Sequence, residues 1–561
     1  MPFLKPTPTP FDPAEWRTRP FAERAHQACL AWIDQGYGVP VGVYLAYLLK
    51  IGFFVAVWFW SCAQSPTLGG PATVTTWWIE PLAFQKAILW SLLFEVLGIG
   101  CGSGPLAGRY LPPFGGFTYF LRPGTVTFPL RPGMPVLGGS DRSWLDVALY
   151  AFIVGALGST LAAPSVDAGW MLCILVAFGI AGTSDRTLLL AARGEHYLVM
   201  LAVFCFAGDW IAGAKAIWLA LWFWAGVSKL NHHFASVVGV MTCNGPLTPS
   251  VPYRRSMVRQ HPSDVAPSTR AQWLGHFGTA LELGVPLVLC FATGPTGLTI
   301  GLVLMVLLHG YISSNVPMGV PLEWNVTVVY GAFFLWLGHP EIGLDQLDAP
   351  LLGGLLGVVL IGVPLLGNLR PDLVPFLPAM RYYAGNWAMS VWLLKRGAEQ
   401  KLKDHLRMTS PWVIDQLSPF YSEDVIEGMV GRVMAFRLMH LHGRALGPLV
   451  QRAAPDLNDR YWIDGELMAG MVRGWNFGDG HLHDERLLAD VQARCGFAPG
   501  ELVCVMVESQ PMFQKTQHWR ILDAARGLLD EGHVPVEALR SRQPWDTHPW
   551  PGLATEPRNE G

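Results

Sequence analysis

Long apolar runs with almost no charge constrain this chain more than any other feature. Residues 1–368 hold 18 Lys and Arg and 18 Asp and Glu, whereas the shorter stretch 369–561 holds 21 and 24. The charged fraction is therefore about 10% in the first stretch and about 23% in the second, and only the second is ordinary for a soluble domain. An apolar run of about 18 residues is long enough to cross a bilayer. The first stretch predicts a membrane region and the second a soluble one.

The apolar runs predict about ten transmembrane helices. We place them near 39–62, 84–101, 144–162, 168–185, 196–213, 214–230, 271–292, 295–314, 324–338 and 351–368. The fold class expected is an all-α polytopic membrane protein, with a transmembrane domain at 39–368 and a C-terminal soluble domain at 369–561. The latter is predicted to be a mainly helical α+β domain, with helices near 384–407, 423–443 and 515–530 and a buried strand at 502–508.

The N-terminal segment 1–38 lacks the basic-then-apolar pattern of a signal peptide. Its residues 21–33 place Phe21, Ala25 and Trp32 on one helical stripe, opposite polar residues. This pattern predicts an amphipathic helix lying on the membrane surface. The alternative is a soluble helix that packs on the C-terminal domain.

Loop charges predict the topology, because loops rich in Lys and Arg face the cytoplasm. The arginines of 103–143, of 186–193 and of 254–270 fall in alternate loops, and the loops between them at 63–83, 163–167, 293–294 and 339–350 contain no Lys or Arg. With ten helices, the N-terminus and the C-terminal domain are both cytoplasmic. The Gly- and Pro-rich loop 103–143 is too long for a plain connector, and we expect it to fold back onto the membrane surface. Membrane lipids are the expected partners, and the net charge of −3 gives no reason to expect nucleic acid.

Ionisable residues inside apolar spans are costly, so each is a candidate for function. Lys50 and Glu95 lie in the first two helices and are expected to form an ion pair. His196 begins the fifth helix and Lys229 ends the sixth. Because the two helices form an antiparallel hairpin, both residues are expected at one depth, facing one pocket. Lys229 beside aromatic residues would be a neutral amine base, with His196 as its hydrogen-bonding partner; the alternative is a snorkelling lysine and an interfacial histidine.

Several segments resemble the HTTM superfamily, which includes the vitamin K-dependent γ-carboxylases. WFWAGVSKLNHHF is similar to their Y-F-x-A-G-x-x-K-L stretch, and SDRT…GEHYLVMLAVF to their D-x-T…N-H-x-Y-L segment. HFGTALELGVPLVLCF followed by VLLHGYISSN resembles the superfamily's acidic helix and the helix closing with His. The resemblance covers about 140–335 and points to a bacterial transmembrane family within the superfamily, and so to a bacterial inner membrane.

The resemblance implies chemistry on a reduced quinone. The family's catalytic lysine falls on Lys229 and its pocket histidine on His196, and we expect the cofactor pocket to include Trp222, Trp224, Glu282 and His309. The reaction implied is carboxylase-like lyase and oxygenase chemistry. The His-to-Lys separation is shorter here, and the large lumenal domain of the carboxylases has no counterpart.

Two H-x-H pairs, at His440 and His442 and at His481 and His483, are a second constellation. An H-x-H pair in a strand or loop can bind one metal ion. Residues 437–443 are predicted to be helical, however, where positions i and i+2 point apart, and we predict no metal site. The nine cysteines contain no C-x-x-C.

Three functions remain open from the sequence. The leading hypothesis is a membrane enzyme that acts on a quinone or another lipid-soluble substrate with a lysine base. The alternative is a non-catalytic scaffold or lipid-binding protein that presents its cytoplasmic domain to a partner. The third is a transporter.

Overall fold

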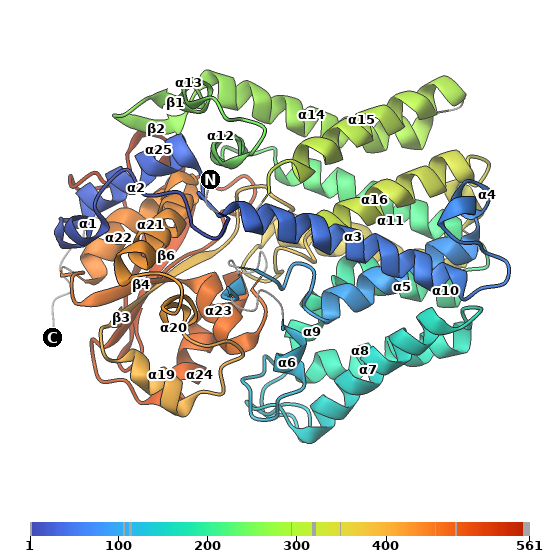
Figure 1. Ribbon diagram of the computed structural model, residues 1–561, viewed down its shortest axis with the longest axis horizontal. Helices are drawn as coiled ribbons and strands as arrows, with labels where there is room; N and C mark the ends of the chain where they lie inside the picture. The colour runs from blue at the N-terminus through green and yellow to red at the C-terminus, as the bar shows by residue number, and fades with distance from the viewer. Residues whose placement is uncertain are drawn as a thin grey trace.

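The computed structural model describes residues 3–104, 107–110, 115–292, 294–316, 321–347, 349–454, 456–476 and 480–553. Long helices extend to one side of the molecule, and a region that contains a β-sheet closes the other side (Figure 1). The boundary between the two sides positions the sites described below.

Six helices are long and apolar enough to cross a membrane. They are α3 (Val41–Ala63), α7 (Trp144–Ala162), α11 (Trp210–Ser228), α14 (Thr269–Phe291), α15 (Pro295–Ser313) and the run Pro350–Leu369, which comprises α17 (Pro350–Gly357), a π-helical turn and α18 (Val363–Leu369). Shorter helices lie among them: α5 (Pro81–Val96), α8 (Ala168–Ser184), α9 (Arg186–Ala191), α10 (Val199–Phe206), α12 (Phe234–Asn244) and α16 (Leu322–Ala332). The protein is therefore a helical membrane protein, and the expected count of ten spans is not confirmed.

Local sequence sets several of the helix ends. Ser143 caps α7 in a reciprocal capping box with Asp146. Pro295 is the first residue of α15, where its missing N–H would be unpaired in any case. These residues fix where the two helices begin.

Smaller elements fill the N-terminal part and the connections. They are α1 (Pro13–Thr18), α2 (Phe21–Gln35), α4 (Val74–Trp77), α6 (Phe117–Phe120), α13 (Val251–Arg255), β1 (Val258–Gln260) and β2 (Asp264–Pro267). β1 and β2 pair antiparallel between α13 and α14.

The C-terminal region, residues 369–553, is built on a five-stranded antiparallel sheet in the order β4-β3-β5-β6-β7. Its strands are β3 (Met389–Lys395), β4 (Arg460–Asp464), β5 (Leu502–Val507), β6 (Thr516–Asp523) and β7 (Gly527–Pro535). Its helices are α19 (Glu399–His405), α20 (Val413–Leu417), α21 (Glu423–Met439), α22 (Leu446–Ala453), α23 (Gly465–Arg473), α24 (Glu485–Cys495) and α25 (Val536–Ser541).

The strand predicted at 502–508 and the helix predicted at 423–443 correspond to β5 and α21. The helix predicted near 515–530 is wrong, because β6 and β7 occupy it. The helix predicted near 384–407 is wrong in its first half, where β3 runs through the middle of the sheet. A short apolar run that is buried on both faces has no period that separates strand from helix.

The amphipathic helix predicted at 21–33 is α2, and it packs between α12 and α21. The Trp32 indole donates to the carbonyl of Val240 at 3.1 Å, and its ring lies 5.5 Å from that of Phe436. The apolar stripe of α2 is thus covered by protein, as in the packing alternative, and not by lipid.

The loop 103–143 carries described residues that dock on the C-terminal region. Arg109 donates to the hydroxyl of Thr409 at 3.1 Å, and Arg122 donates to the carbonyl of Met408 at 2.8 Å. Further along the loop, Arg494 reaches Asp141 at 2.7 Å. The contacts explain the length of the loop, since it ties the membrane helices to the sheet region.

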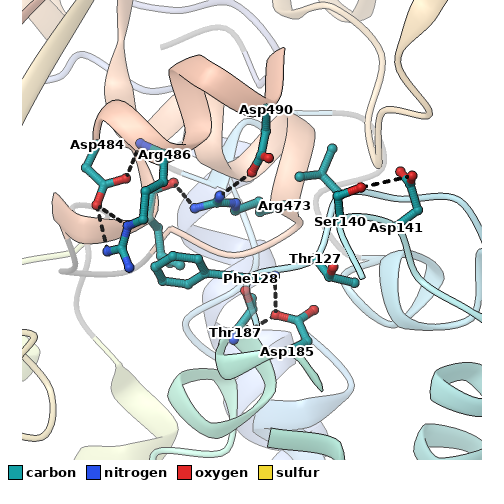
Figure 2. Close-up of polar contacts among 12 residues, drawn as sticks. Thr127, Phe128, Ser140, Asp141, Asp185, Thr187, Arg473, Asp484, Arg486 and Asp490 are labelled. Carbon is teal, nitrogen blue, oxygen red and sulfur yellow. Dashed lines mark hydrogen bonds and ion pairs between the residues drawn. The ribbon is translucent and has the colours of Figure 1, made fainter. Parts of the chain in front are cut away.

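Phe128 is the centre of this docking surface, as Figure 2 shows. The guanidinium carbons of Arg186, Arg473 and Arg486 lie 4.0, 4.3 and 4.3 Å from the centroid of its ring. Arg473 also pairs with Asp490 at 2.9 Å, and Arg486 pairs with Asp484. The aromatic face therefore stacks with cations from both sides of the boundary.

Candidate functional site

Lys229 caps the C-terminal end of α11 and is buried. Its Nζ lies 2.5 Å from Oε2 of Glu282 on α14, and it donates to the carbonyls of Tyr382 and Ala225 at 2.7 and 3.3 Å. These three acceptors match the three protons of an ammonium group. Lys229 and Glu282, both predicted site residues, are therefore brought together as a buried ion pair.

His196 lies in a π-helical turn just before α10 and is fully buried. The indole of Trp324 donates to its Nδ1 at 3.0 Å, which leaves the ring proton on Nε2. Nε2 has no hydrogen-bond partner among the described residues. Trp324 contacts the ring of Tyr382 at 5.4 Å, and Tyr382 in turn accepts from Lys229. His196 and Lys229 thus belong to one cluster, with Trp324 and Tyr382 between them.

His309 is held by two side chains. The indole of Trp222 donates to Nε2 of His309 at 2.9 Å, and Nδ1 lies 2.6 Å from Oδ1 of Asn325. This pattern fixes a neutral imidazole with its proton on Nδ1. Trp224 is directed elsewhere, because its indole donates to the carbonyl of Leu360 at 2.6 Å. The structure therefore brings Trp222 and His309 together and keeps Trp224 apart from them.

The cluster includes ionisable residues that sequence reasoning missed. Arg193 has a left-handed backbone, and its Nε lies 3.7 Å from Oε1 of Glu195. The same oxygen accepts from the hydroxyl of Tyr382 at 2.7 Å. Arg193 and Glu195 stand beside His196 in the sequence and could have been noticed there. Tyr382 could not have been identified from the sequence, because it lies 187 residues after Glu195 and no local pattern connects the two.

The ion pair predicted between Lys50 and Glu95 is wrong. Lys50 pairs with Glu323 at 3.2 Å, while Glu95 accepts from the backbone N–H of Cys101 at 2.9 Å. Because α16 packs against both α3 and α5, its Glu323 lies next to Lys50 on α3 and pairs with it. In the described part of the chain, Glu95, Cys101 and Glu323 are the one group close enough to share a metal ion. Lys50 and Arg193 lie against that group and supply positive charge already.

An open cleft lies beside Lys229, where the membrane helices meet the C-terminal region. It encloses about 640 Å³, part of which is open solvent. Its lining comes from the segment after α11, from the first turns of α14, from the β1–β2 hairpin and from the C-terminal region. The lining residues are Lys229, Asn231, His232, Phe234, Ala235, Ser236, Arg259, Pro267, Gln272, Gly275, His276, Thr279, Leu441, Arg444 and Arg540.

Positive side chains dominate the charge of this cleft. Arg259 pairs with Asp264 at 2.9 Å, and Arg540 pairs with Glu537 at 3.1 Å, each through Nη1, and neither acidic partner lines the cleft. Arg444 is fully buried, and its Nη1 donates to the carbonyls of Arg542 and Leu539 at 3.0 and 3.4 Å. Burial lowers the pKa of Arg444 to about 10, which still leaves it charged at neutral pH.

Behind the cleft, a group of buried imidazoles joins the two parts of the molecule. Nε2 of His233 donates to Oε1 of Gln510 at 2.7 Å, and the His233 ring lies 5.5 Å from that of His442. Trp387 packs against His440 and His442 at 5.1 and 5.2 Å. Burial lowers the pKa of His440 to about 3 and lowers that of His442 well below its usual value. The first H-x-H pair therefore lies in the core as neutral rings.

In the second H-x-H pair, His481 and His483 contact different residues. Nδ1 of His483 lies 2.7 Å from the hydroxyl of Ser390, whereas His481 lies 3.8 Å from Glu508. The two imidazoles have different partners, as expected for packed side chains and not for a shared ligand.

A family model described as "Transmembrane protein of unknown function (DUF3556)" matches residues 1–553. No curated protein and no solved structure matches the chain. The assignment to the HTTM and γ-carboxylase-like superfamily is wrong, since the match over the whole chain is to a different family and no carboxylase model matches. The quoted segments are short and apolar, and many transmembrane helices share such a composition.

Proposed function

Since the chain belongs to the DUF3556 family of transmembrane proteins, we propose that this integral membrane protein is a lipid-binding protein. It holds the polar group of an amphiphilic anion in the cleft beside Lys229. The apolar part of the ligand lies along α14, in contact with the membrane.

The observation that carries this proposal is the position of a cationic cleft at the end of two spans. Gln272 and His276, from the first turns of α14, line the cleft. Trp273 and Phe277 follow them on the same helix, and their side chains are 70% and 62% exposed. Basic pockets between transmembrane helices are typical sites for anionic headgroups. A ligand with its head in the cleft therefore has an apolar surface beside it.

The contacts of Lys229 favour binding over base catalysis. A lysine base must be neutral, and this one has a carboxylate and two carbonyls as acceptors. These acceptors would satisfy all three protons of an ammonium group, and the carboxylate offsets part of the cost of burying its charge. Lys229 and His196 as a catalytic pair, and a quinone as their cofactor, therefore stay sequence predictions, while the lipid-binding proposal rests on the cleft alone.

We also infer that the cleft opens toward the cytoplasm of a bacterial inner membrane. The arginines at 254–259 lie at the same end as α2 and the C-terminal region, since Arg255 pairs with Asp34 of α2 at 2.7 Å. The positive-inside rule assigns such an end to the cytoplasm. A reporter fused after residue 553 should be active in the cytoplasm and inactive when it requires export.

Bound lipid provides the direct test. The full-length protein is extracted in mild detergent, transferred to nanodiscs and analysed by native mass spectrometry. The wild type should retain one class of amphiphilic anion in stoichiometric amount. Gly275→Leu places a side chain in the cleft, where an added Cβ has only ordinary contacts at 3.5 Å or more, and should reduce retention about tenfold.

A matched substitution controls for the effect on the helix. Gly284 lies on the same helix, and an added Cβ there meets no atom within 4 Å among the described residues. Gly284→Leu should therefore retain the ligand. Equal retention by both variants, or a wild type that carries no amphiphile, contradicts the proposal.

A further inference from the structure

We propose that the ligand's polar group is a phosphate carried by a lipid, and that Arg444 binds it through the edge formed by Nε and Nη2. The inference rests on the proposed function, because it assigns the headgroup of the amphiphile in the same cleft. It also identifies Arg444, which no sequence pattern singled out, as the residue that selects the ligand.

The first step is the unused edge of Arg444. The residue lines the cleft and its side chain has 0% exposure. Nη1 is occupied by two backbone carbonyls. Nε and Nη2 are both buried and have no hydrogen-bond partner among the described residues. A buried charged donor without an acceptor is costly, so this edge is expected to receive one.

The second step compares the contacts that Nε and Nη2 make in other arginines of this protein. In Arg255, Nε and Nη2 donate to the two oxygens of Asp34 at 2.8 and 2.7 Å. In Arg370 they donate to the two oxygens of Asp372 at 3.0 and 2.7 Å. In the core, Arg437 binds Asp464 with the same two nitrogens. The partner expected for Arg444 is therefore an anion with two oxygens on one centre.

The third step is that the nearest acidic groups of the chain have other partners. Asp264 accepts from Arg259, from the backbone N–H of Ala266 and from the amide of Gln543. Asp546 accepts from the backbone N–H of Gln543 at 2.8 Å. Neither carboxylate has a hydrogen bond to Arg444 among the described contacts, so the anion is expected to come from outside the described part of the chain.

The fourth step decides whether the anion bound by Arg444 is a phosphate or a carboxylate. The fork of Arg444 uses two oxygens, which is all that a carboxylate has. The cleft offers further donors, namely Arg259, Arg540, His232, Asn231 and Gln272. A phosphate can accept from these donors with oxygens that the fork leaves unused, whereas a carboxylate must share its two oxygens between the fork and the other donors, so the donor set favours phosphate. The exposed aromatic side chains beside the cleft on α14 favour a lipid as the source of the phosphate.

The experiment uses the full chain in phosphatidylcholine nanodiscs, with and without phosphatidylglycerol, and native mass spectrometry of the bound lipid. Oleate provides a carboxylate, and inorganic phosphate provides the same anion without a tail. The wild type should bind phosphatidylglycerol at least tenfold more tightly than oleate, and inorganic phosphate should compete only weakly.

Arg444→Lys keeps the positive charge but removes the two parallel donors Nε and Nη2. We expect it to weaken phosphatidylglycerol binding about tenfold. Arg432→Lys is the matched control, because Arg432 is also buried and donates to backbone carbonyls, at Tyr37 and Thr7, but does not line the cleft. The control should bind as the wild type does. Arg259→Gln is a second cleft variant, on a mostly exposed residue, in case Arg444→Lys does not fold.

The outcomes separate this inference from the proposed function. If the wild type binds an amphiphile but prefers oleate, or if folded Arg444→Lys binds phosphatidylglycerol as tightly as the wild type, the inference is overturned and lipid binding survives. If Arg444→Lys does not fold, unchanged binding by Arg259→Gln overturns it. If inorganic phosphate displaces the lipid at equal concentration, the lipid source is overturned. If no amphiphile binds to the wild type, both proposals fail.

Discussion

Three cations among the membrane helices and one in the cleft, Arg444, have different surroundings. Among the membrane helices, Lys50 and Lys229 each face a carboxylate within 3.2 Å, and Arg193 lies within 3.9 Å of two. In the cleft, Arg444 has carbonyls on one nitrogen and no described partner on the other two. Burying an ion costs several kcal/mol unless it is paired. The paired cations therefore hold the helices together, whereas the unpaired edge of Arg444 is the basis of the proposal that it binds a ligand.

The largest effect is expected from breaking an ion pair among the membrane helices. Lys229→Ala leaves Glu282 buried without its cation, which should lower the free energy of unfolding by about 3–5 kcal/mol. Thermal unfolding in detergent, followed by tryptophan fluorescence, measures the loss. Adding Glu282→Gln to the same chain should restore part of it, because the uncompensated charge is removed. An unchanged midpoint for Lys229→Ala would show that the pair does not hold the helices together.

The second prediction concerns the docking surface around Phe128, where Arg473 and Arg486 pair with carboxylates. Phe128→Ala removes the ring that three guanidinium groups contact and should cost about 3 kcal/mol. Phe128→Leu keeps most of the volume and should cost about 1 kcal/mol, the share of the cation–π contacts. Chemical denaturation compares the two variants. Lipid retention should not change in either, because Arg473 and Arg486 already have carboxylates; a loss of lipid in the leucine variant would contradict the separation of the two surfaces.

The third prediction concerns the buried histidines, which, unlike arginine, change charge in the experimentally accessible pH range. Burial lowers the pKa of His440 to about 3 and that of His483 to about 4, whereas an unfolded histidine titrates near pH 6.5. Because the unfolded chain binds protons first, stability is full above about pH 6.5 and is lost as the pH falls toward the folded values. At pH 5 each histidine should cost about 2 kcal/mol. Unfolding midpoints between pH 7.5 and 5 measure the slope, and His440→Leu should flatten it; an identical slope in that variant would exclude His440 as a source.

The smallest effect on stability is expected at the rim of the cleft. The side chain of Arg259 is half exposed and pairs with Asp264, and such surface pairs contribute less than about 1 kcal/mol. Arg259→Gln should therefore leave the unfolding midpoint unchanged and weaken lipid binding about threefold at low salt, with the difference fading as salt rises. Isothermal titration with lipid in detergent, at two salt concentrations, checks this. A large drop in stability would contradict the assignment of this pair to the solvent-exposed surface.

The positions of the membrane helices could be predicted, because an apolar run of sufficient length has few alternatives. Glu282 and His309 could be singled out as ionisable groups in such runs. Their partners could not, since Glu282 meets Lys229 and Asn325 meets His309 only once the helices pack. The same limit hid Arg444, an ordinary arginine in the sequence. Strand β3 was missed because six of its seven residues are buried, and an apolar run buried on both faces has no period that separates a strand from a helix.

The central claim is that Arg444 holds a lipid phosphate, and the phosphorus content of the purified protein tests it most directly. The wild type and Arg444→Lys are delipidated side by side in detergent, and phosphorus is quantified against protein. The wild type should keep one phosphate per chain, and the variant should keep about one tenth as much. Equal phosphorus in the two folded proteins would contradict the account.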